Sequence, residues 1–235
     1  MAETKVALIT GANKGIGLEI ARQLGKQGII VVIGSRDSQR GQAAADTLKA
    51  GGIDAHTIKL EVTDAADREA ALTFLQETFG RLDILVNNAG VLLDAEGLTP
   101  EVLARTYDAN VTAPYFLTET LLPLLKAAPS ARVVHQSSIL GSLATHAAGL
   151  PPEWMLPAYS SSKAALNMLG VIQAMQLKDT RVKVNIAHPG SVKTDMNPSG
   201  DLSLEEGAKT AVTLATLPDG GPTGGFFHRG EPLPW

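Results

Sequence analysis

Short apolar runs alternate with longer amphipathic segments along this chain of 235 residues. Apolar runs rich in β-branched residues are typical of buried strands, whereas longer segments with a helical period are typical of helices. The pattern predicts strands, the last of them short, at Lys5–Thr10, Ile29–Gly34, Ala55–Leu60, Leu82–Val86, Arg132–Gln136, Arg181–Ala187 and Gly225–His228.

The segments between these strands are predicted to be helical. They are Ile16–Gln27, Gln39–Ala50, a helix capped by Asp64 and running to about Phe79, Pro100–Lys126, Ala158–Lys178 and Leu204–Thr216. Pro114 should disturb or divide the helix that contains it, because proline has no amide hydrogen to donate. The Gly- and Pro-rich end of the chain is expected to form turns.

Strands that alternate with helices predict crossover units and a mostly parallel sheet. Such crossovers are right-handed in almost all proteins. No linker and no repeat interrupts the pattern. We therefore expect a single α/β domain over residues 1–235, a Rossmann-type doubly wound parallel sheet with helices on both faces.

Composition narrows the possible functions. An apolar content of 44% is enough for a sizeable core, and a net charge of −4 without a basic stripe argues against a nucleic-acid surface. The absence of cysteine excludes disulfides and thiolate catalysis. His135, His146 and His188 are not at metal-ligand spacing, so no metal site is predicted, and His135 is interpreted as structural. Without a signal peptide or a membrane-spanning run, a cytoplasmic protein with no membrane partner is expected.

A Gly-rich turn, Thr10–Gly17 (TGANKGIG), joins the first strand to the first helix. Glycines allow a tight turn, close approach to a pyrophosphate and close packing of the helix on the sheet, and the helix N-terminus favours anions. Taken alone, the turn could be an ordinary βα loop. Its position between strand and helix favours a dinucleotide site, with cofactor contacts from Gly11, Asn13, Lys14, Gly15, Ile16 and Gly17.

The end of the second strand indicates which dinucleotide is bound. NAD sites carry an acidic residue there, whereas this chain has Gly34-Ser35 followed by Arg36. Arg36 could bind a 2′-phosphate with its planar fork, and Lys14 and Arg40 are further candidate cations. Arg40 could equally lie on a solvated helix face. Asp37 is interpreted as a helix N-cap, with Ser38 as the other candidate.

Tyr159 and Lys163 are four residues apart on a predicted helix, so they share one face. An ammonium group near a phenol favours the phenolate and lowers a pKa that is ordinarily ~10. Such a phenol could give a proton to a carbonyl oxygen. A Tyr-x-x-x-Lys pair alone could also be an ordinary surface pair.

Other polar residues end the neighbouring strands, where ligands bind in such sheets. Ser137-Ser138 ends the fifth strand, Asn87–Gly90 the fourth and Pro189-Gly190 the sixth. Asn110 stands mid-helix, where an amide is unusual unless it bonds something. In this order, TGANKGIG, NNAG, Asn110, SS, YSSSK and HPGSVKTDM resemble the motifs of the short-chain dehydrogenase/reductase family, most closely its carbonyl-reductase-like branch. The resemblance covers essentially the whole chain.

The resemblance implies a role for each matching residue. Ser138 would position the substrate carbonyl oxygen, Tyr159 would donate the proton, and Lys163 would bind the nicotinamide ribose and lower the pKa of Tyr159. Asn110 would hold a water that links Lys163 to solvent. Ser137 would support the turn. Further cofactor contacts would come from Asn87, Ala89, Gly90, Pro189, Gly190, Val192 and Thr194, the last two at the nicotinamide carboxamide.

The chain departs from the family pattern in two places. Glu61-Val62 replaces the usual Asp-Val at the adenine, so this contact is expected in altered form. The segment Ala144–Leu156 lengthens the spacing from Ser138 to Tyr159 and is expected to form a loop on the substrate side. Trp154 and Met155 could wall an apolar pocket there, or pack only within the loop.

These observations predict an NADP(H)-dependent oxidoreductase that reduces a small ketone or aldehyde. The alternatives are the same enzyme working as an alcohol dehydrogenase, and a dinucleotide-binding sensor or scaffold without turnover. The substrate and the stereochemistry are left open, because variable loops form the pocket walls. A homo-oligomer paired through the helices Pro100–Lys126 and Ala158–Lys178 is possible, unless the lengthened segment before Tyr159 obstructs it.

Overall fold

An eight-stranded sheet runs through the protein, of which the computed structural model describes residues 4–235. The strands are β1 (Val6–Thr10), β2 (Ile30–Ser35), β3 (Ala55–Lys59), β4 (Ile84–Asn87), β5 (Ala131–Gln136), β6 (Val182–Ala187), β7 (Phe226–His228) and β8 (Glu231–Pro232). Their order is β3-β2-β1-β4-β5-β6-β7-β8. All neighbours are parallel except β7 and β8, which are antiparallel.

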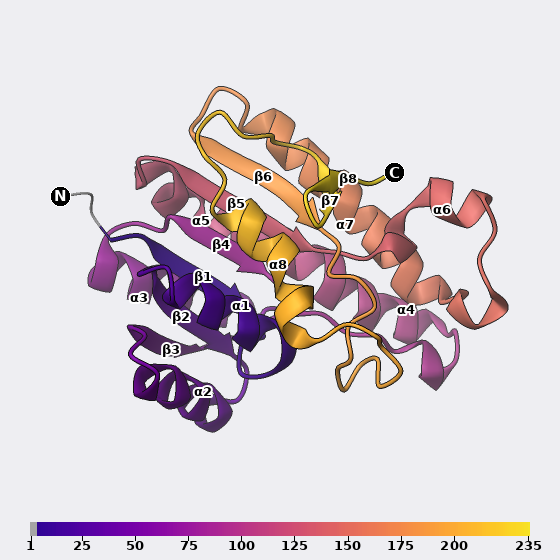
Figure 1. The fold of residues 1–235 in the computed structure, drawn as a ribbon, viewed down its shortest axis with the longest axis horizontal. Helices are drawn as coiled ribbons and strands as arrows, with labels where there is room; N and C mark the ends of the chain where they lie inside the picture. Colours follow the sequence, from indigo (N-terminus) through magenta and orange to yellow (C-terminus); the bar gives the residue numbers. More distant parts are fainter. Residues whose placement is uncertain (1–3) are drawn as a thin grey trace.

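Helices cover both faces of the sheet (Figure 1). They are α1 (Gly15–Gly25), α2 (Ser38–Ala50), α3 (Ala65–Phe79), α4 (Pro100–Tyr107), α5 (Ala113–Ala127), α6 (Leu143–Ala147), α7 (Pro157–Gln176) and α8 (Leu204–Ala215). One apolar core joins α1, α2 and α8 to the sheet, and a second core on the opposite face joins α3, α5 and α7. This arrangement confirms the predicted fold class, a mostly parallel doubly wound sheet.

The division expected in the long fourth helix is present. A π-helical turn, Asp108–Thr112, separates α4 from α5, and the amide of Ala113 donates to the carbonyl of Asp108, five residues back. Pro114 lies in the first turn of α5 and cannot donate to the carbonyl four residues back, so the wider turn absorbs the missing bond. The turn also displays Asn110 toward the centre of the molecule, where it is buried.

Two predictions about irregular segments are wrong. The stretch Ala144–Leu156 is not a loop throughout, because it contains most of α6 and a 3₁₀ turn at Pro152–Trp154. The C-terminal end is not only turns, because β8 pairs with β7. Long-range contacts order both: the amide of Ala144 donates to the carbonyl of Trp235 at 2.7 Å, and the Trp235 ring stacks on Phe226 with centroids 5.7 Å apart.

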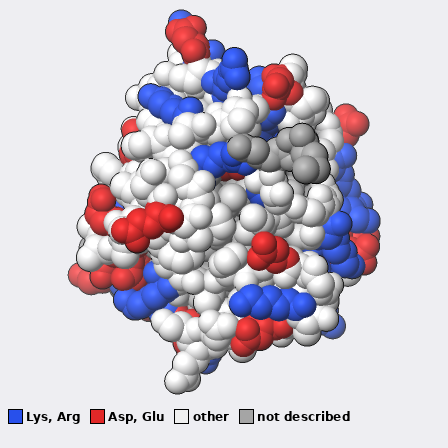
Figure 2. All heavy atoms as spheres, turned by 90° about the vertical axis from the view of Figure 1, so that its left-hand side faces the viewer, with Lys and Arg blue, Asp and Glu red and all other residues white. Residues whose placement is uncertain are grey.

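Charged side chains are mixed on the face where the strands begin, the left side of Figure 1. Lys and Arg side chains are interspersed there with Asp and Glu and with uncharged surface (Figure 2). Among residues 4–235, no helix is both long and apolar enough to cross a membrane. Exposed apolar side chains on α5 and α7 include Phe116, Met168 and Met175. Pairing of subunits through these helices stays a prediction.

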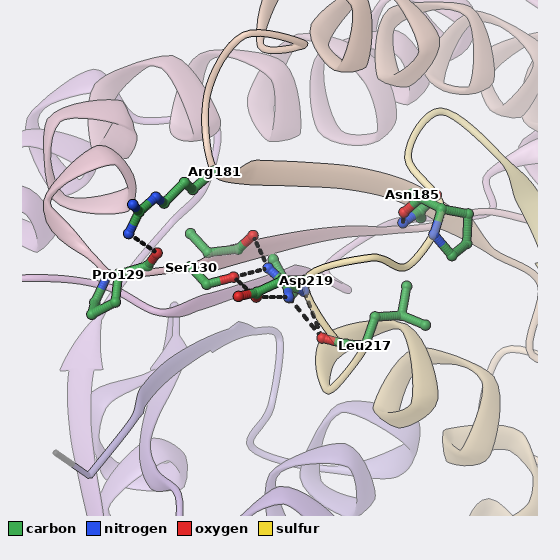
Figure 3. Close-up of polar contacts among 9 residues, drawn as sticks. Pro129, Ser130, Arg181, Asn185, Leu217 and Asp219 are labelled. Atoms are coloured by element: carbon green, nitrogen blue, oxygen red, sulfur yellow. Dashed lines mark hydrogen bonds and ion pairs between the residues drawn. The ribbon is translucent and has the colours of Figure 1, made fainter. Parts of the chain in front are cut away.

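A buried arginine joins the start of β5 to the segment after α8. The Arg132 side chain is only 3% exposed and 3.0 Å from the carboxylate of Asp219. Its Nε and Nη2 donate to the carbonyl of Leu217 at 2.9 and 2.7 Å, and its Nη1 donates to Ser130 Oγ at 2.6 Å. Ser130, Leu217 and Asp219 converge on this guanidinium (Figure 3). The contacts compensate the desolvation of a buried charge.

We expect Arg132→Ala to lower the free energy of unfolding by about 2–4 kcal/mol, because it removes several charge-assisted hydrogen bonds and leaves carbonyl groups unpaired. Arg181→Ala is the matched control. Arg181 is exposed and donates to the carbonyl of Pro129 at 3.4 Å in the same region (Figure 3), so its loss should cost about 0.5 kcal/mol or less. Urea unfolding of both variants measures the difference, and equal effects would contradict this account.

Candidate active site

The glycines of the Gly-rich turn after β1 allow it to pack closely against the segment that follows β4. Gly11 has φ +61°, a left-handed conformation that glycine adopts without strain. A Cβ on Gly17 would lie 2.5 Å from Asn88 Nδ2 and 2.8 Å from the carbonyl oxygen of Gly11. Helix α1 starts without a side-chain cap and without an acidic residue in its first turn. Its first amides therefore remain available to an anion such as a pyrophosphate.

Asn88 joins this turn to the end of β4 and was missed by sequence reasoning. Its Nδ2 donates to the carbonyl of Thr10 at 2.9 Å, while Thr10 Oγ1 accepts from the amides of Asn88 and Ala89 at 3.0 and 2.9 Å. The second Asn of the NNAG motif was the available signal. These bonds hold Ala89 beside the Gly-rich turn, as expected for two segments that share one cofactor.

Two of the three candidate cations meet in one pocket. An open pocket of about 490 Å³ is lined by Asn13, Lys14, Leu18, Arg40, Ala43, Ala44, Thr47 and Asp195. Lys14 Nζ contacts Asp195 Oδ2 at 2.5 Å, and both side chains are exposed. Arg36 is exposed at the end of β2 and is not among the lining residues. The positive charge available to a 2′-phosphate in this pocket therefore comes from Lys14 and Arg40.

Asp37 is the N-cap of α2, as predicted. Its Oδ1 accepts from the amides of Gln39 and Arg40, each at 3.0 Å. Its other oxygen, Oδ2, lies 3.3 Å from Arg40 Nε. The carboxylate therefore also restrains a candidate phosphate ligand.

Tyr159 and Lys163 lie on α7 with Lys163 Nζ 5.5 Å from the centre of the Tyr159 ring. Lys163 is buried, and its Nζ donates to the backbone carbonyl of Gln136 at the end of β5, at 2.9 Å. Burial lowers the pKa of Lys163 to about 8, because desolvation disfavours the ammonium form. A change of protonation near neutral pH is thus within reach of this side chain.

The pKa of Tyr159 is raised to about 12, the opposite of the direction expected from its pairing with Lys163. Desolvation is the largest cause, the charge of Asp94 adds to it, and a hydrogen bond with Ser138 works against it. The residue as a whole is partly exposed. Desolvation therefore outweighs any effect of the nearby ammonium group of Lys163, which bonds the carbonyl of Gln136.

Both polar atoms of the Asn110 side-chain amide are hydrogen-bonded within the protein. Its Oδ1 accepts from the amide of Val91 at 2.8 Å, and its Nδ2 donates to the carbonyl of Val91 at 2.9 Å and to Ser162 Oγ at 3.0 Å. A Cβ on Gly90 would lie 3.0 Å from Asn110 Oδ1 and 3.6 Å from Lys163 Nζ. The structure therefore brings Gly90, Asn110 and Lys163 together, and glycine leaves room for them.

Ser138 stands at the turn after β5, half-buried, and its Oγ accepts from the amide of Leu140 at 3.2 Å. His188, not predicted as a site residue, holds this turn. Its Nδ1 accepts from the amides of Ile139 and Gly190, at 3.2 and 3.4 Å. His188 therefore links the turn of Ser138 to the segment that follows β6.

Ser137 has a structural contact at the end of β5. Its hydroxyl is buried and donates to Asn167 Oδ1 on α7 at 2.6 Å, away from the position of Ser138. The bond fixes the end of β5 against α7.

Asp94 caps the helix that carries Tyr159 and was also missed. The residue before α7, Leu156, offers no side-chain cap. Asp94 supplies one from the segment after β4: Oδ1 accepts from the amide of Ala158 at 2.9 Å and Oδ2 from the amide of Tyr159 at 3.1 Å. No sequence signal marks a cap that lies more than sixty residues away.

The side chain of Asn87, a predicted cofactor residue, turns into the core. Asn87 is buried, and its Nδ2 contacts Thr118 Oγ1 at 3.0 Å and His135 Nδ1 at 3.3 Å. His135 in turn contacts Gln173 Oε1 at 2.9 Å through Nε2, which agrees with its structural interpretation. The alternation of side chains along β4 directs Asn87 toward the core that contains α5.

Four more predicted cofactor residues, Glu61, Val62, Val192 and Thr194, have side chains that are engaged within the protein. Val62 and Val192 are buried, and Val192 packs so tightly that a Cβ on Gly207 would lie 2.4 Å from it. Glu61 accepts from Thr63 Oγ1 at 3.1 Å, and Thr194 Oγ1 accepts from the amide of Asn197 at 3.1 Å. These four side chains support turns and core packing. Their backbone groups stay candidates for cofactor contact.

Trp154 and Met155 lie in the segment before α7, and are 44% and 62% exposed. Neither lines the pocket at Lys14. Their place beside a substrate therefore stays a prediction. Pro189 and Gly190 lie directly after β6 and are half-buried, with Gly190 at φ +90°.

A dinucleotide cradle after β1 and a Ser-Tyr-Lys cluster at the same edge of a doubly wound sheet define a class of nicotinamide-dependent oxidoreductases. The chain belongs to the short chain dehydrogenase family, whose model matches residues 5–202.

Two relatives are similar to this protein over the whole length of its chain. It is 34% identical over 296 residues to "Short-chain dehydrogenase/reductase 1" of Saponaria officinalis, covering 100% of this chain and 97% of the relative. It is 33% identical to "Carbonyl reductase [NADPH] 1" of Sus scrofa, covering 100% and 95%. Because the first alignment is longer than the 235 residues of this chain, that relative carries segments that this chain lacks.

The fold is similar to that of an NADPH-bound carbonyl reductase from chicken fatty liver. The TM-score is 0.88 at 30% identity, and the match covers 99% of this chain and 100% of that one. The likeness extends over the whole structure, including the segments that carry the site.

We expect stability to fall between about pH 6.5 and pH 4. Burial lowers the pKa of His135 and of His188 from 6.5 to about 4. As the pH falls below 6.5, these two histidines become protonated in the unfolded chain but stay neutral in the folded protein. The stability present at neutral pH is therefore lost as the pH approaches their pKa in the folded state. Urea unfolding at about pH 7.5 and about pH 5 measures this loss.

The control is the double variant His135→Asn/His188→Asn. Its stability is lower at every pH because hydrogen bonds are lost, but its change between the two pH values should shrink. An unfolding midpoint in the parent that is the same at both pH values would contradict the expectation.

Proposed function

We propose that this protein is an NADP(H)-dependent carbonyl reductase that converts a ketone or aldehyde to an alcohol, reversibly, with Tyr159 as proton donor. The observation that carries the proposal is the pair of Tyr159 and buried Lys163, with Lys163 Nζ 5.5 Å from the centre of the ring, packed against the turn of Ser138 at the edge of the sheet. Relatives named carbonyl reductase support the substrate class.

The residues present fit a phosphorylated dinucleotide. Gly11 and Gly17 let the turn pack against Ala89 and Asn88, and the uncapped N-terminus of α1 is left for the pyrophosphate. Lys14 and Arg40 line a pocket suited to the 2′-phosphate. Arg36 adds positive charge at the end of β2. NADPH, when bound, supplies the hydride that adds to the carbonyl carbon.

The raised pKa of Tyr159 suits the reduction direction. At neutral pH the phenol keeps its proton and can donate a hydrogen bond to the substrate carbonyl oxygen, with the Ser138 hydroxyl as a second donor. As negative charge develops on that oxygen, the phenol proton moves to it. The ammonium group of Lys163 then stabilises the resulting tyrosinate through space. The carbonyl of Gln136 holds Lys163 in place.

A dinucleotide-binding scaffold without turnover is the alternative from another class. Loss of a reactive residue would favour it, but Asn110, Ser138, Tyr159 and Lys163 are all present. Lys163 is also buried next to the Tyr159 ring, and strongly shifted pKa values such as those of this pair favour a catalytic site.

We expect Tyr159→Phe to lower kcat about 10²–10⁴-fold, because the proton donor is removed while the ring and its packing stay. NADPH oxidation in the presence of a panel of activated ketones measures the rate, and fluorescence titration should show that NADPH still binds. The control is Tyr115→Phe, on α5 where the ring contacts Phe116, which should keep the parent rate. A Tyr159→Phe variant with the parent rate would overturn the mechanism.

We expect Lys14→Ala and Arg40→Ala each to raise the KM for NADPH by about tenfold, since each removes a charged ligand of the 2′-phosphate. The KM for NADH should not change, because NADH has no 2′-phosphate. Arg36→Ala should act in the same direction but less strongly, because Arg36 does not line the pocket. A parent enzyme that uses NADH better than NADPH would contradict the assignment of these cations.

A further inference from the structure

Gln136 carries a buried amide without a partner. The residue is only 7% exposed, and neither Nε2 nor Oε1 has a hydrogen-bond partner among the described residues. Burial of an unsatisfied amide costs about 1–3 kcal/mol per group, so folded proteins rarely retain one without a use for it. The neighbouring strand shows the usual case: buried Asn185 donates to the carbonyl of Pro222 at 2.9 Å and accepts from the amide of Gly225 at 3.1 Å.

Gln136 is the last residue of β5, at the edge where the site lies. The strand pairs with β4 on one side and β6 on the other, and Gln136 is opposite Ala187. Ala89-Gly90 and Pro189-Gly190 follow these two strands, so Gln136 stands between the two candidate cofactor segments.

The side chain of Gln136 lies on the cofactor-turn face of the sheet. Strand residues alternate between faces, so Gln136 shares a face with Val134, which belongs to the core of α1 and α8. The Gly-rich turn leads into α1 on this same face. The backbone carbonyl of Gln136 accepts from Lys163 Nζ, so the residue is also joined directly to the reactive group.

From this placement we infer that the Gln136 amide binds the nicotinamide-ribose half of the cofactor. The inference rests on the proposed function. An amide satisfies both of its polar atoms only with a partner that donates and accepts. The nicotinamide carboxamide and the ribose hydroxyls do both, whereas a ketone oxygen and a phosphate only accept. The half of the dinucleotide that reaches the ends of β4, β5 and β6 is therefore the matching partner.

The test is Gln136→Met, which keeps the length of the side chain and removes both polar atoms. The cofactor-free protein should gain about 2–4 °C in Tm, because an unsatisfied amide is gone. The Kd for NADPH should rise about tenfold, since the amide no longer bonds its ligand. The Kd for adenosine 2′,5′-bisphosphate, which lacks the nicotinamide half, should stay at the parent value. Differential scanning fluorimetry and isothermal titration calorimetry give these quantities.

Asn185→Leu is the matched control. It removes a buried amide that is fully bonded on the adjacent strand (Asn185 is labelled in Figure 3). This variant should lose stability, and its folded fraction should bind NADPH like the parent. A higher Tm for Gln136→Met and a lower Tm for Asn185→Leu would distinguish an amide that is unsatisfied without its ligand from one that stabilises the fold.

The outcomes separate the inference from the proposed function. If the parent does not bind NADPH, the proposed function fails. If the parent binds but Gln136→Met binds equally well, as it would if a buried water satisfied the amide, the inference alone is overturned. Equal weakening toward NADPH and adenosine 2′,5′-bisphosphate also overturns it. Should Gln136→Met fail to fold, Gln136→Leu carries the same expectations.

Discussion

The bond between the buried ammonium group of Lys163 and the backbone carbonyl of Gln136 determines how the site is assembled. A charge that is almost removed from water requires close polar partners, and this one takes its partner from the end of β5. The contact fixes α7 against the sheet at the edge where the turn of Ser138 begins. Next to Lys163, Gly90 leaves room for the amide of Asn110, whose Oδ1 would lie 3.0 Å from a Cβ at that position.

The same burial acts oppositely on the two titrating groups of the pair. It lowers the pKa of Lys163 and raises that of Tyr159, so a dry environment favours the neutral form of both. A neutral phenol is the form that a reductase needs for its proton donor. The electrostatics of the site are therefore a compromise between exclusion of water and stabilisation of the tyrosinate that the reaction would leave behind.

Support for the reactive residues comes from distant segments of the chain. Asp94, from the segment after β4, caps the helix of Tyr159, and His188, after β6, holds the turn of Ser138. Asn88 connects the Gly-rich turn to β4. The contacts of His188 and Asn88 join the ends of neighbouring strands, and those of Asp94 join a strand end to α7. The segments at this edge of the sheet therefore hold one another in place.

The sequence by itself determined most of the elements and the family. Periodicity placed the strands and helices to within a few residues, and Asp64, Asp37 and Pro114 act as their chemistry predicts, because caps and prolines work through local backbone bonds. The order of the motifs predicts Ser138, Tyr159 and Lys163 as the reactive residues. Only the tertiary structure decided the direction of the Tyr159 pKa, the inward turn of Asn87, and the parts of Asp94, His188 and Gln136. Desolvation and contacts between remote strand ends control these properties, and neither leaves a local pattern in the sequence.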